Sequence, residues 1–132
     1  MKLKLQVVTP TRTVVQSEAD QVELPGELGY LGILPGHTPL ITVLKAGVLT
    51  YRNGGDERSL AIAAGFAEIA NDSVTVLADQ AEGPGEVDVA AAERERSGAE
   101  EELKSASRDS LDEIRARLEL AQARLAIAKR GR

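Results

Sequence analysis

The run Glu82-Gly83-Pro84-Gly85 divides the sequence into two parts of different composition, and it limits the possible folds more than any other feature. Before it, short apolar segments alternate with Gly, Pro, Asn and Asp, a pattern typical of strands joined by turns. After it, the chain has no proline and is rich in Ala, Glu, Arg and Leu, which favour helices. A chain of 132 residues fits one compact domain with an appendage. We therefore predict a β domain over residues 1–82, a linker over 83–86 and helices over 87–132.

The first part is predicted to consist of half-buried strands. Leu3, Leu5 and Val7 alternate with polar residues, so they share one face of a strand. Residues 53–56 (NGGD) and 71–72 (ND) each separate two apolar segments and predict hairpin turns, because Gly and Asn adopt the positive φ that tight turns require. Strands that recur about every 8 to 12 residues, with no helix between them, favour an antiparallel sandwich or barrel over a parallel sheet.

The second part is predicted to form two helices joined by a turn. The first helix is expected from Val87 to about Ser105, and residues 105–110 collect Ser and Asp, which prefer turns and caps. Ser110 with Glu113 fits a capping box at the start of a second helix. The expected arrangement is an antiparallel hairpin.

The two expected helices differ in how much apolar surface they carry. On the second, apolar residues at spacings of three and four form one stripe: Leu111, Ile114, Leu118, Ala121, Leu125 and Ala128. On the first, the apolar residues are mostly small: Val87, Ala90, Ala91, Ala99 and Leu103. Gly98 costs the first helix about 1 kcal/mol of helix propensity. We expect Leu103 to pack on this stripe in a loosely packed hairpin that a ligand or a competing surface can move.

Composition excludes several classes of function. The sequence has no cysteine and a single histidine, which excludes disulfides and thiolate chemistry and argues against a metal site. The net charge of -5 argues against nucleic acid as a partner, because phosphate binding needs a basic face. No apolar run approaches the roughly 20 residues that span a bilayer. The start, MKLKLQVV, lacks the apolar stretch of a secretory signal, so we expect a soluble cytoplasmic protein.

No group of residues in the sequence suggests an enzyme. His37 has no cysteine to pair with and no serine in a nucleophile-elbow context, so we expect backbone atoms near a turn to satisfy it. Gly26, Gly29 and Gly32 do not form the phosphate-binding pattern GxGxxG, and GxxxxGK followed by Ser or Thr is absent. The glutamates of residues 93–102 predict a solvated helix face.

The most specific motif lies where glycine and proline are concentrated, with GELG at residues 26–29 and GILPGHTPL at 32–40. Three other runs are VVTP at 7–10, GFAEI at 65–69 and VTVLAD at 74–79. These runs, in this order over the whole chain, resemble the epsilon subunits of F-type ATP synthases.

The resemblance implies a fold and a role. The family has an N-terminal antiparallel β-sandwich of about ten strands followed by a C-terminal two-helix hairpin. Its members are noncatalytic subunits of the central stalk. They bind the γ subunit and rest on the c-subunit rotor ring, and they couple proton flow to ATP synthesis by the catalytic α and β subunits. Such a subunit is peripheral on the cytoplasmic face of the bacterial inner membrane, and it touches the membrane only through the complex.

The resemblance also implies contact residues. Glu27, Leu28, Tyr30 and His37 become candidate contacts to the rotor ring or to γ, at the ring-facing end of the sandwich. In many members of the family a small or acidic residue stands in the place of Tyr30.

The family's helices form a regulatory arm, which either folds down as a hairpin or extends into the catalytic head and inhibits ATP hydrolysis. As a continuous helix, residues 87–129 would reach about 65 Å. Cations on the second helix suit acidic loops of the catalytic β subunits: Arg115, Arg117, Arg124, Lys129 and Arg130. The alternative reading is that the terminal cations complement the helix dipole, and the two readings are compatible.

Some members of the family bind ATP through an (I/L)DxxRA motif that opens the first helix. Here the run is VDVAAA at residues 87–92, so Asp88 is retained and Ala91 replaces the arginine. On the second helix the usual arginine positions hold Gln122 and Ala126, with Arg124 between them. Because phosphates need cations, we expect at most a weak nucleotide site at Asp88 and Arg124, and no tightly bound ATP or other cofactor.

The sequence is also compatible with a function of a different class. The chain could be a free-standing ligand-sensing or adaptor module, with the sandwich as scaffold and the hairpin as a switch. Such a module would not co-purify with γ and the catalytic subunits.

Overall fold

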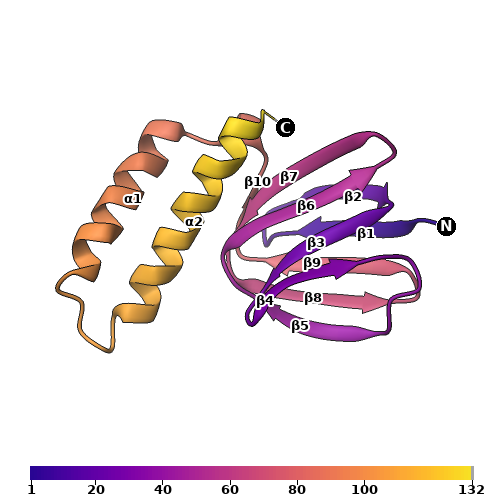
Figure 1. Ribbon diagram of the computed structural model, residues 1–132, viewed down its shortest axis with the longest axis horizontal. Helices are drawn as coiled ribbons and strands as arrows, with labels where there is room; N and C mark the ends of the chain where they lie inside the picture. Colours follow the sequence, from indigo (N-terminus) through magenta and orange to yellow (C-terminus); the bar gives the residue numbers. More distant parts are fainter. Residues whose placement is uncertain (132) are drawn as a thin grey trace.

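The computed structural model describes residues 1–131 and has a β-sandwich beside a helical hairpin (Figure 1). Ten strands come first: β1 Leu3–Val8, β2 Thr13–Ala19, β3 Gln21–Gly26, β4 Gly29–Ile33, β5 Leu40–Leu44, β6 Gly47–Asn53, β7 Asp56–Ile62, β8 Gly65–Ala70, β9 Ser73–Ala78 and β10 Ala81–Glu82. A 3-10 turn, η1 (Pro84–Glu86), leads into helices α1 (Val89–Leu103) and α2 (Leu111–Arg130). The predicted fold class is confirmed.

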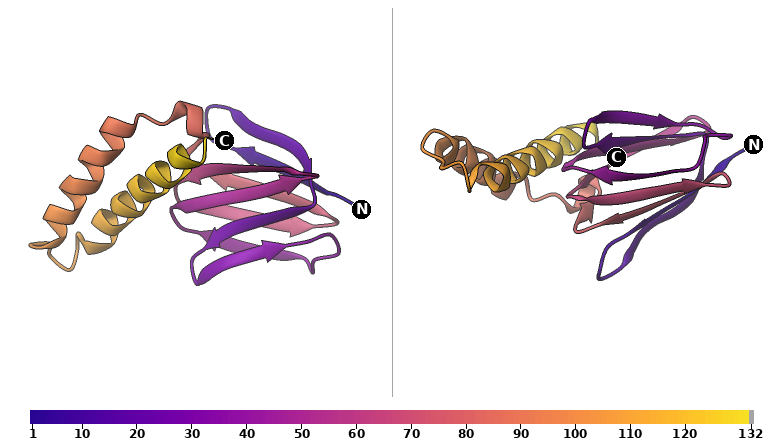
Figure 2. Two further views of the ribbon diagram at one scale, coloured as in Figure 1. Left: turned by 45° about the horizontal axis from the view of Figure 1, so that its top comes forward. Right: turned by 90° about the horizontal axis from the view of Figure 1, so that it is seen from below.

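The strands form two layers that belong to one continuous sheet (Figure 2). Its order is β10-β7-β6-β3-β5-β8-β9-β1-β2, and β4 pairs with β3. The pairs are antiparallel, as predicted, except for β1 with β9, which are parallel with Val7 opposite Val76. A parallel pair needs a long connection, and most of the sandwich lies between these two strands in sequence.

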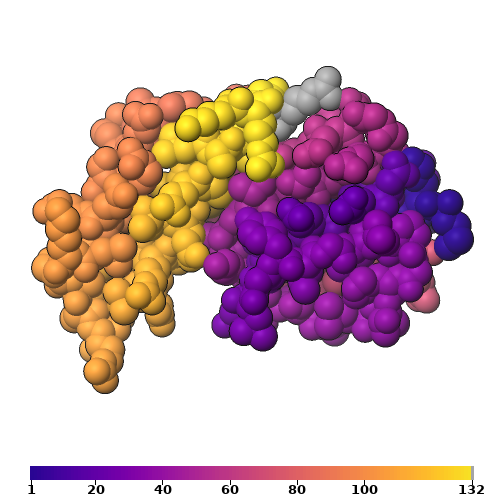
Figure 3. Space-filling view, in the orientation of Figure 1, coloured from indigo at the N-terminus to yellow at the C-terminus, as the bar shows by residue number. Residues whose placement is uncertain are grey.

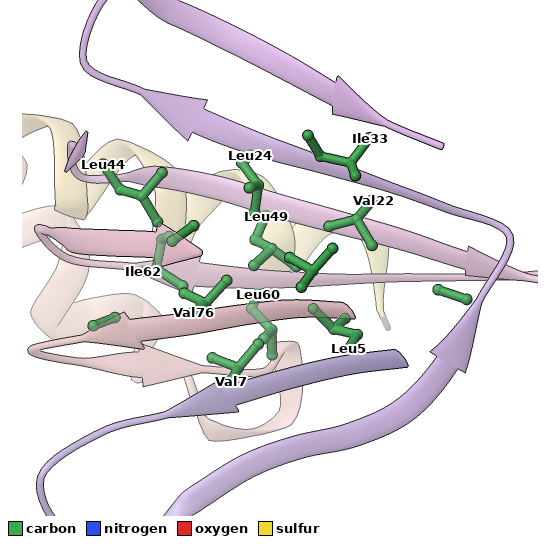
Figure 4. Close-up of a cluster of buried hydrophobic side chains, with 14 of the residues drawn as sticks. Leu5, Val7, Val22, Leu24, Ile33, Leu44, Leu49, Leu60, Ile62 and Val76 are labelled. Carbon is green, nitrogen blue, oxygen red and sulfur yellow. The ribbon is translucent and has the colours of Figure 1, made fainter. Parts of the chain in front are cut away.

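Alternating residues of both layers fill an aliphatic core (Figure 4). Leu5 and Val7 of β1 are buried, and so are Leu24, Leu49 and Val76 from strands of the two layers. The alternation predicted for β1 is therefore confirmed.

Both predicted hairpin turns are present. Gly54 has a φ of 64° in the β6–β7 turn, which side-chain-bearing residues rarely adopt. In the β8–β9 turn, Asn71 and Asp72 have φ values of 51° and 58°. Two successive residues with positive φ match the type I′ turn, whose twist suits a two-residue hairpin.

The predicted helix ends differ from the observed ones. Helix α1 begins at Val89, because Asp88 is its N-cap and the Asp88 Oδ1 accepts a hydrogen bond from the amide of Ala91 at 3.0 Å. The capping box predicted at Ser110 does not form. Ser110 has helical φ and ψ of -101° and -7°, and its Oγ donates to the carbonyl of Ser107 at 3.2 Å.

The single apolar stripe expected on α2 is incomplete, because α2 buries two faces. Ile114 and Ala121 are buried, and their spacing of seven matches that of the buried Ala92 and Ala99 on α1, which defines the helix–helix seam. Ile127 follows Ala121 by six residues, which places it about 240° further around the axis of α2 and thus on another face. On that face it packs on the sandwich. Four predicted packing residues are half-buried: Leu103, Leu111, Leu118 and Leu125. Helix α2 thus lies between α1 and the sandwich (Figures 1 and 3).

Candidate functional site

Three of the predicted contact residues lie at one end of the sandwich, Glu27 and Leu28 in the β3–β4 turn and Tyr30 at the start of β4. The amide of Glu27 donates to the carbonyl of Val43 at 3.0 Å, which fixes the turn beside β5. Leu28, at the tip, is fully exposed. Tyr30 is also exposed, and its hydroxyl accepts a hydrogen bond from the amide of Val48 at 3.2 Å. This end therefore presents an apolar tip and an anchored aromatic ring to solvent.

His37 lies at the opposite end of β4, so the expectation of a single contact end is wrong. Its Nδ1 is 2.6 Å from the carbonyl oxygen of Thr38, as expected for a histidine satisfied by backbone. The amide of Gly36 donates to Asp72 Oδ1 at 2.7 Å and ties this loop to the β8–β9 turn. The glycine- and proline-rich motif separates into two ends because the five residues of β4 run between them.

A row of exposed apolar side chains, which sequence reasoning missed, crosses the outer face of β5, β8 and β9. Val43 lies opposite Phe66, and Phe66 lies opposite Leu77. These side chains are 56%, 48% and 40% exposed, and Ile41 on β5 is 70% exposed. We name Ile41, Val43, Phe66 and Leu77 the apolar row. A signal was available, because Ala67 and Ile69 alternate with Phe66 and predict that Phe66 faces outward.

The hairpin is fixed to the sandwich through α2. Ile127 is fully buried against Ala61 of β7. Beside this contact, Arg124 forms an ion pair through Nε with Glu82 of β10, and its Nη2 donates to Gln80 Oε1 at 2.7 Å. Near the end of α2, Arg130 Nη1 donates to the buried Ser59 Oγ at 2.9 Å.

Within the hairpin, Arg117 of α2 is held by two carboxylates of α1. Its Nε donates to Glu95 at 2.7 Å, and Nη2 donates to Glu102 at 2.8 Å. Hydrogen bonds from Arg117 lower the pKa of the Glu102 carboxyl, and hydrogen bonds to Glu102 and Glu95 raise the pKa of Arg117. Both shifts favour the charged forms and thus the closed hairpin.

The five predicted cations of α2 therefore fall into two groups. The side chains of Arg117, Arg124 and Arg130 donate hydrogen bonds to other side chains of the protein. Arg115 and Lys129 are exposed, and neither forms an ion pair or side-chain hydrogen bond within residues 1–131. Of the first group, Arg117 and Arg124 pair with carboxylates, whereas Arg130 donates to neutral hydroxyls of the sandwich.

The structure brings Asp88 and Arg124 together in a pocket between the hairpin and the sandwich. The charged side chains that line this pocket are Glu82, Glu86, Asp88, Glu95, Arg117 and Arg124. Both arginines already have carboxylate partners, and the Asp88 carboxylate caps α1. An anionic ligand would have to compete with these carboxylates for the same cations.

Residues 1–131 contain neither a cluster of metal ligands nor a membrane-spanning helix. In this part, no three side chains of the His, Asp and Glu type lie close enough together to hold a metal ion. Neither α1 nor α2 is long and apolar enough to cross a membrane.

Sequence comparisons relate the chain to proteins of one kind. A family model for the ATP synthase delta/epsilon chain β-sandwich domain matches residues 2–84. The chain is 40% identical over 132 residues to the ATP synthase epsilon chain 2 of Syntrophotalea carbinolica, covering 98% of this chain and 96% of that one. It is 48% identical over 102 residues to the ATP synthase epsilon chain of Koribacter versatilis, covering 77% and 72% of the two chains.

A solved structure agrees on the fold. One chain in a cryo-EM structure of the OSCP, F1 and c-ring of the Euglena gracilis mitochondrial ATP synthase superposes with a TM-score of 0.81, at 20% identity. The match covers 95% of this chain and 80% of that chain, so it includes the helical hairpin as well as the sandwich.

Proposed function

The chain belongs to the family of ATP synthase epsilon chains, as the sequence resemblance predicted, and we propose that it is a noncatalytic central-stalk subunit. In this role it binds the γ subunit and the c-subunit ring, and it couples rotation of the ring to ATP synthesis by the catalytic α and β subunits. Its place is then at the cytoplasmic face of the bacterial inner membrane, held there through the complex.

The observation that carries the docking role is the apolar row. Four large apolar side chains on one sheet face are exposed to water, which favours a protein partner that covers them. We assign this face to the γ subunit, because a stalk subunit needs a broad apolar contact to stay bound to γ during rotation. Leu28 and Glu27, which project from the β3–β4 turn, suit a smaller contact with polar loops of the ring. His37, at the other end of β4, lies outside both surfaces.

The hairpin is proposed as an arm that inhibits ATP hydrolysis when it extends from residues 83–86. Its cations suit acidic loops of the catalytic β subunits. The support for a movable arm is the modest seam between α1 and α2, in which two of the four buried residues are alanines of α1. Burial of such small side chains stabilises the hairpin little.

The test compares the complex with and without residues 86–132. Deletion is expected to leave the sandwich bound to γ and to raise the rate of ATP hydrolysis. Unchanged hydrolysis would contradict the inhibitory role and leave the docking role intact. Failure of the full-length chain to co-purify with γ would contradict the docking role and favour a free-standing module.

A further inference from the structure

The contact between α2 and the sandwich consists of a small apolar cluster and several polar contacts, which differ in how far they are exposed to water. The apolar part is small: Ile127 and Ala123 pack with Ala61, and the partly buried Val48 and Val87 lie against them. At the end of α2, Arg130 meets neutral hydroxyls, and Lys45 with Glu119 is an exposed pair at 3.2 Å. Exposed pairs of this kind contribute little to stability.

The pair of Arg124 with Glu82 differs from the others because it is shielded from water. Its two side chains are 24% and 23% exposed, the lowest values of any ion pair in the described chain. Arg124 also donates to Gln80, so the guanidinium is held from two directions. Charge-assisted hydrogen bonds in a shielded position are stronger than those between fully hydrated groups.

Within this pair, Glu82 is the member that belongs to the sandwich. It lies on β10, opposite Ala61 in the sheet register, so its carboxylate stands next to the surface that receives Ile127. The chain then leaves the sheet through η1, which Arg12 ties down by its ion pair with Glu86 at 2.7 Å. Glu82 is thus a fixed charge on the rigid side of the junction, and Arg124 is the moving charge on the arm.

We propose that Glu82 is a latch for the folded arm: it holds α2 on the sandwich by pairing with Arg124, and this pair must break before Arg124 can meet an acidic partner. The latch rests on the proposed function only for its effect on the complex. Arg124 has one guanidinium, so the sandwich and a second carboxylate surface compete for it.

The latch can be tested on the isolated full-length chain. The chain has no cysteine, so Glu68→Cys on β8 and Arg108→Cys in the α1–α2 turn give two unique spin-label positions. Pulsed electron paramagnetic resonance then measures the distance between the labels, with a single narrow distance distribution expected for the folded arm. Glu82→Gln keeps the shape but removes the charge, and it should raise the ratio of open to folded molecules by about tenfold.

The matched control is Glu101→Gln, which removes the same charge from a pair with Lys104 whose side chains are 75% and 72% exposed. It should leave the distances unchanged. Unchanged distances in Glu82→Gln, or equal opening in both variants, would overturn the latch. Should Glu82→Gln fold poorly, the exchange of Glu82→Arg with Arg124→Glu is expected to restore the folded distance, and an arm that stays open in this exchange would also overturn the latch.

Hydrolysis by the complex separates the latch from the proposed function. Opening of the arm in Glu82→Gln together with slower ATP hydrolysis supports both. Opening with unchanged hydrolysis supports the latch and contradicts the inhibitory role of the arm.

Discussion

Arg117 on α2 and Glu102 on α1 form a bidentate ion pair, with Nη1 to Oε1 at 3.2 Å and Nη2 to Oε2 at 2.8 Å. Glu95 accepts from the third donor of the same guanidinium at 2.7 Å. One side chain therefore joins two turns of α1 to α2, across a seam that contains few large apolar side chains.

Arg117→Lys is expected to loosen the hairpin, because an ammonium cannot form the planar paired contact with Glu102 and also reach Glu95. Hydrogen exchange of the α1 amides should become faster, while amides of β1 and β9 keep their rates. Arg115→Lys is the control, since Arg115 lies exposed on the same helix and has no side-chain partner within residues 1–131. Equal acceleration in both variants would contradict a specific role of Arg117.

The closed hairpin should weaken in acid through Glu102. Its pKa is lowered in the folded state from the ordinary value of 4.5, chiefly by hydrogen bonds from Arg117, so between the two values the open hairpin binds more protons. The stabilisation is complete above about pH 4.5 and is lost as the pH falls through the lower, folded value. Carboxyl NMR should show Glu102 titrating below 4.5 in the wild type and at its ordinary value in Arg117→Ala. An unchanged titration in that variant would exclude Arg117 as the cause.

ATP is expected to bind weakly or not at all to the isolated chain. Arg124 and Arg117 are neutralised by carboxylates, and Ala91 stands where ATP-binding members of the family have an arginine. Calorimetric titration with ATP and magnesium should give no heat beyond dilution at micromolar concentrations, and magnesium alone is the control. A micromolar Kd would contradict this prediction.

Ile127→Ala is expected to release α2 from the sandwich without unfolding the sandwich. Ile127 is fully buried against Ala61, and removal of such a side chain costs about 2 to 5 kcal/mol in a core. The substitution should weaken the binding of α2 to the sandwich and leave the stability of the sheet unchanged. Hydrogen exchange of the α2 amides should therefore accelerate, while the midpoint of denaturant unfolding of the β-sheet stays the same. Ile127→Val, at about 0.5 to 1.5 kcal/mol, should have a smaller effect in the same direction. A lowered midpoint for the sheet would show that α2 is part of the sandwich core.

The sequence was sufficient for features that depend on local chemistry. The hairpin turns at residues 53–56 and 71–72 follow from the need for positive φ. The change from strands to helices follows from the absence of proline and the enrichment in Ala, Glu, Arg and Leu after residue 85. The alternation of apolar and polar residues in β1 likewise predicted which face of this strand is buried.

The features that were misassigned or missed depend on partners distant in the sequence. Eight of the eleven residues 118–128 are Leu, Ala or Ile, and they lie on more than one face of the helix. Periodicity alone therefore could not separate the face that meets α1 from the face of Ile127 that meets Ala61. The pair of Arg124 with Glu82 joins residues 42 positions apart. No local sequence pattern distinguishes Glu82 from the other acidic residues as the partner of Arg124. Tyr30 and His37 are close in sequence, but a strand of five residues places them toward opposite ends.

The apolar row should determine binding to γ. Phe66 lies at its centre between Val43 and Leu77, and 48% of its side chain is exposed in the isolated chain. Phe66→Asp places an unpaired charge where the contact excludes water, so the Kd for γ, measured by interferometry, should rise by at least about 30-fold. Val89→Asp, at a comparably exposed apolar position on α1, should bind γ as the wild type does. Equal affinities for Phe66→Asp and the wild type would show that γ docks on another face of the sandwich.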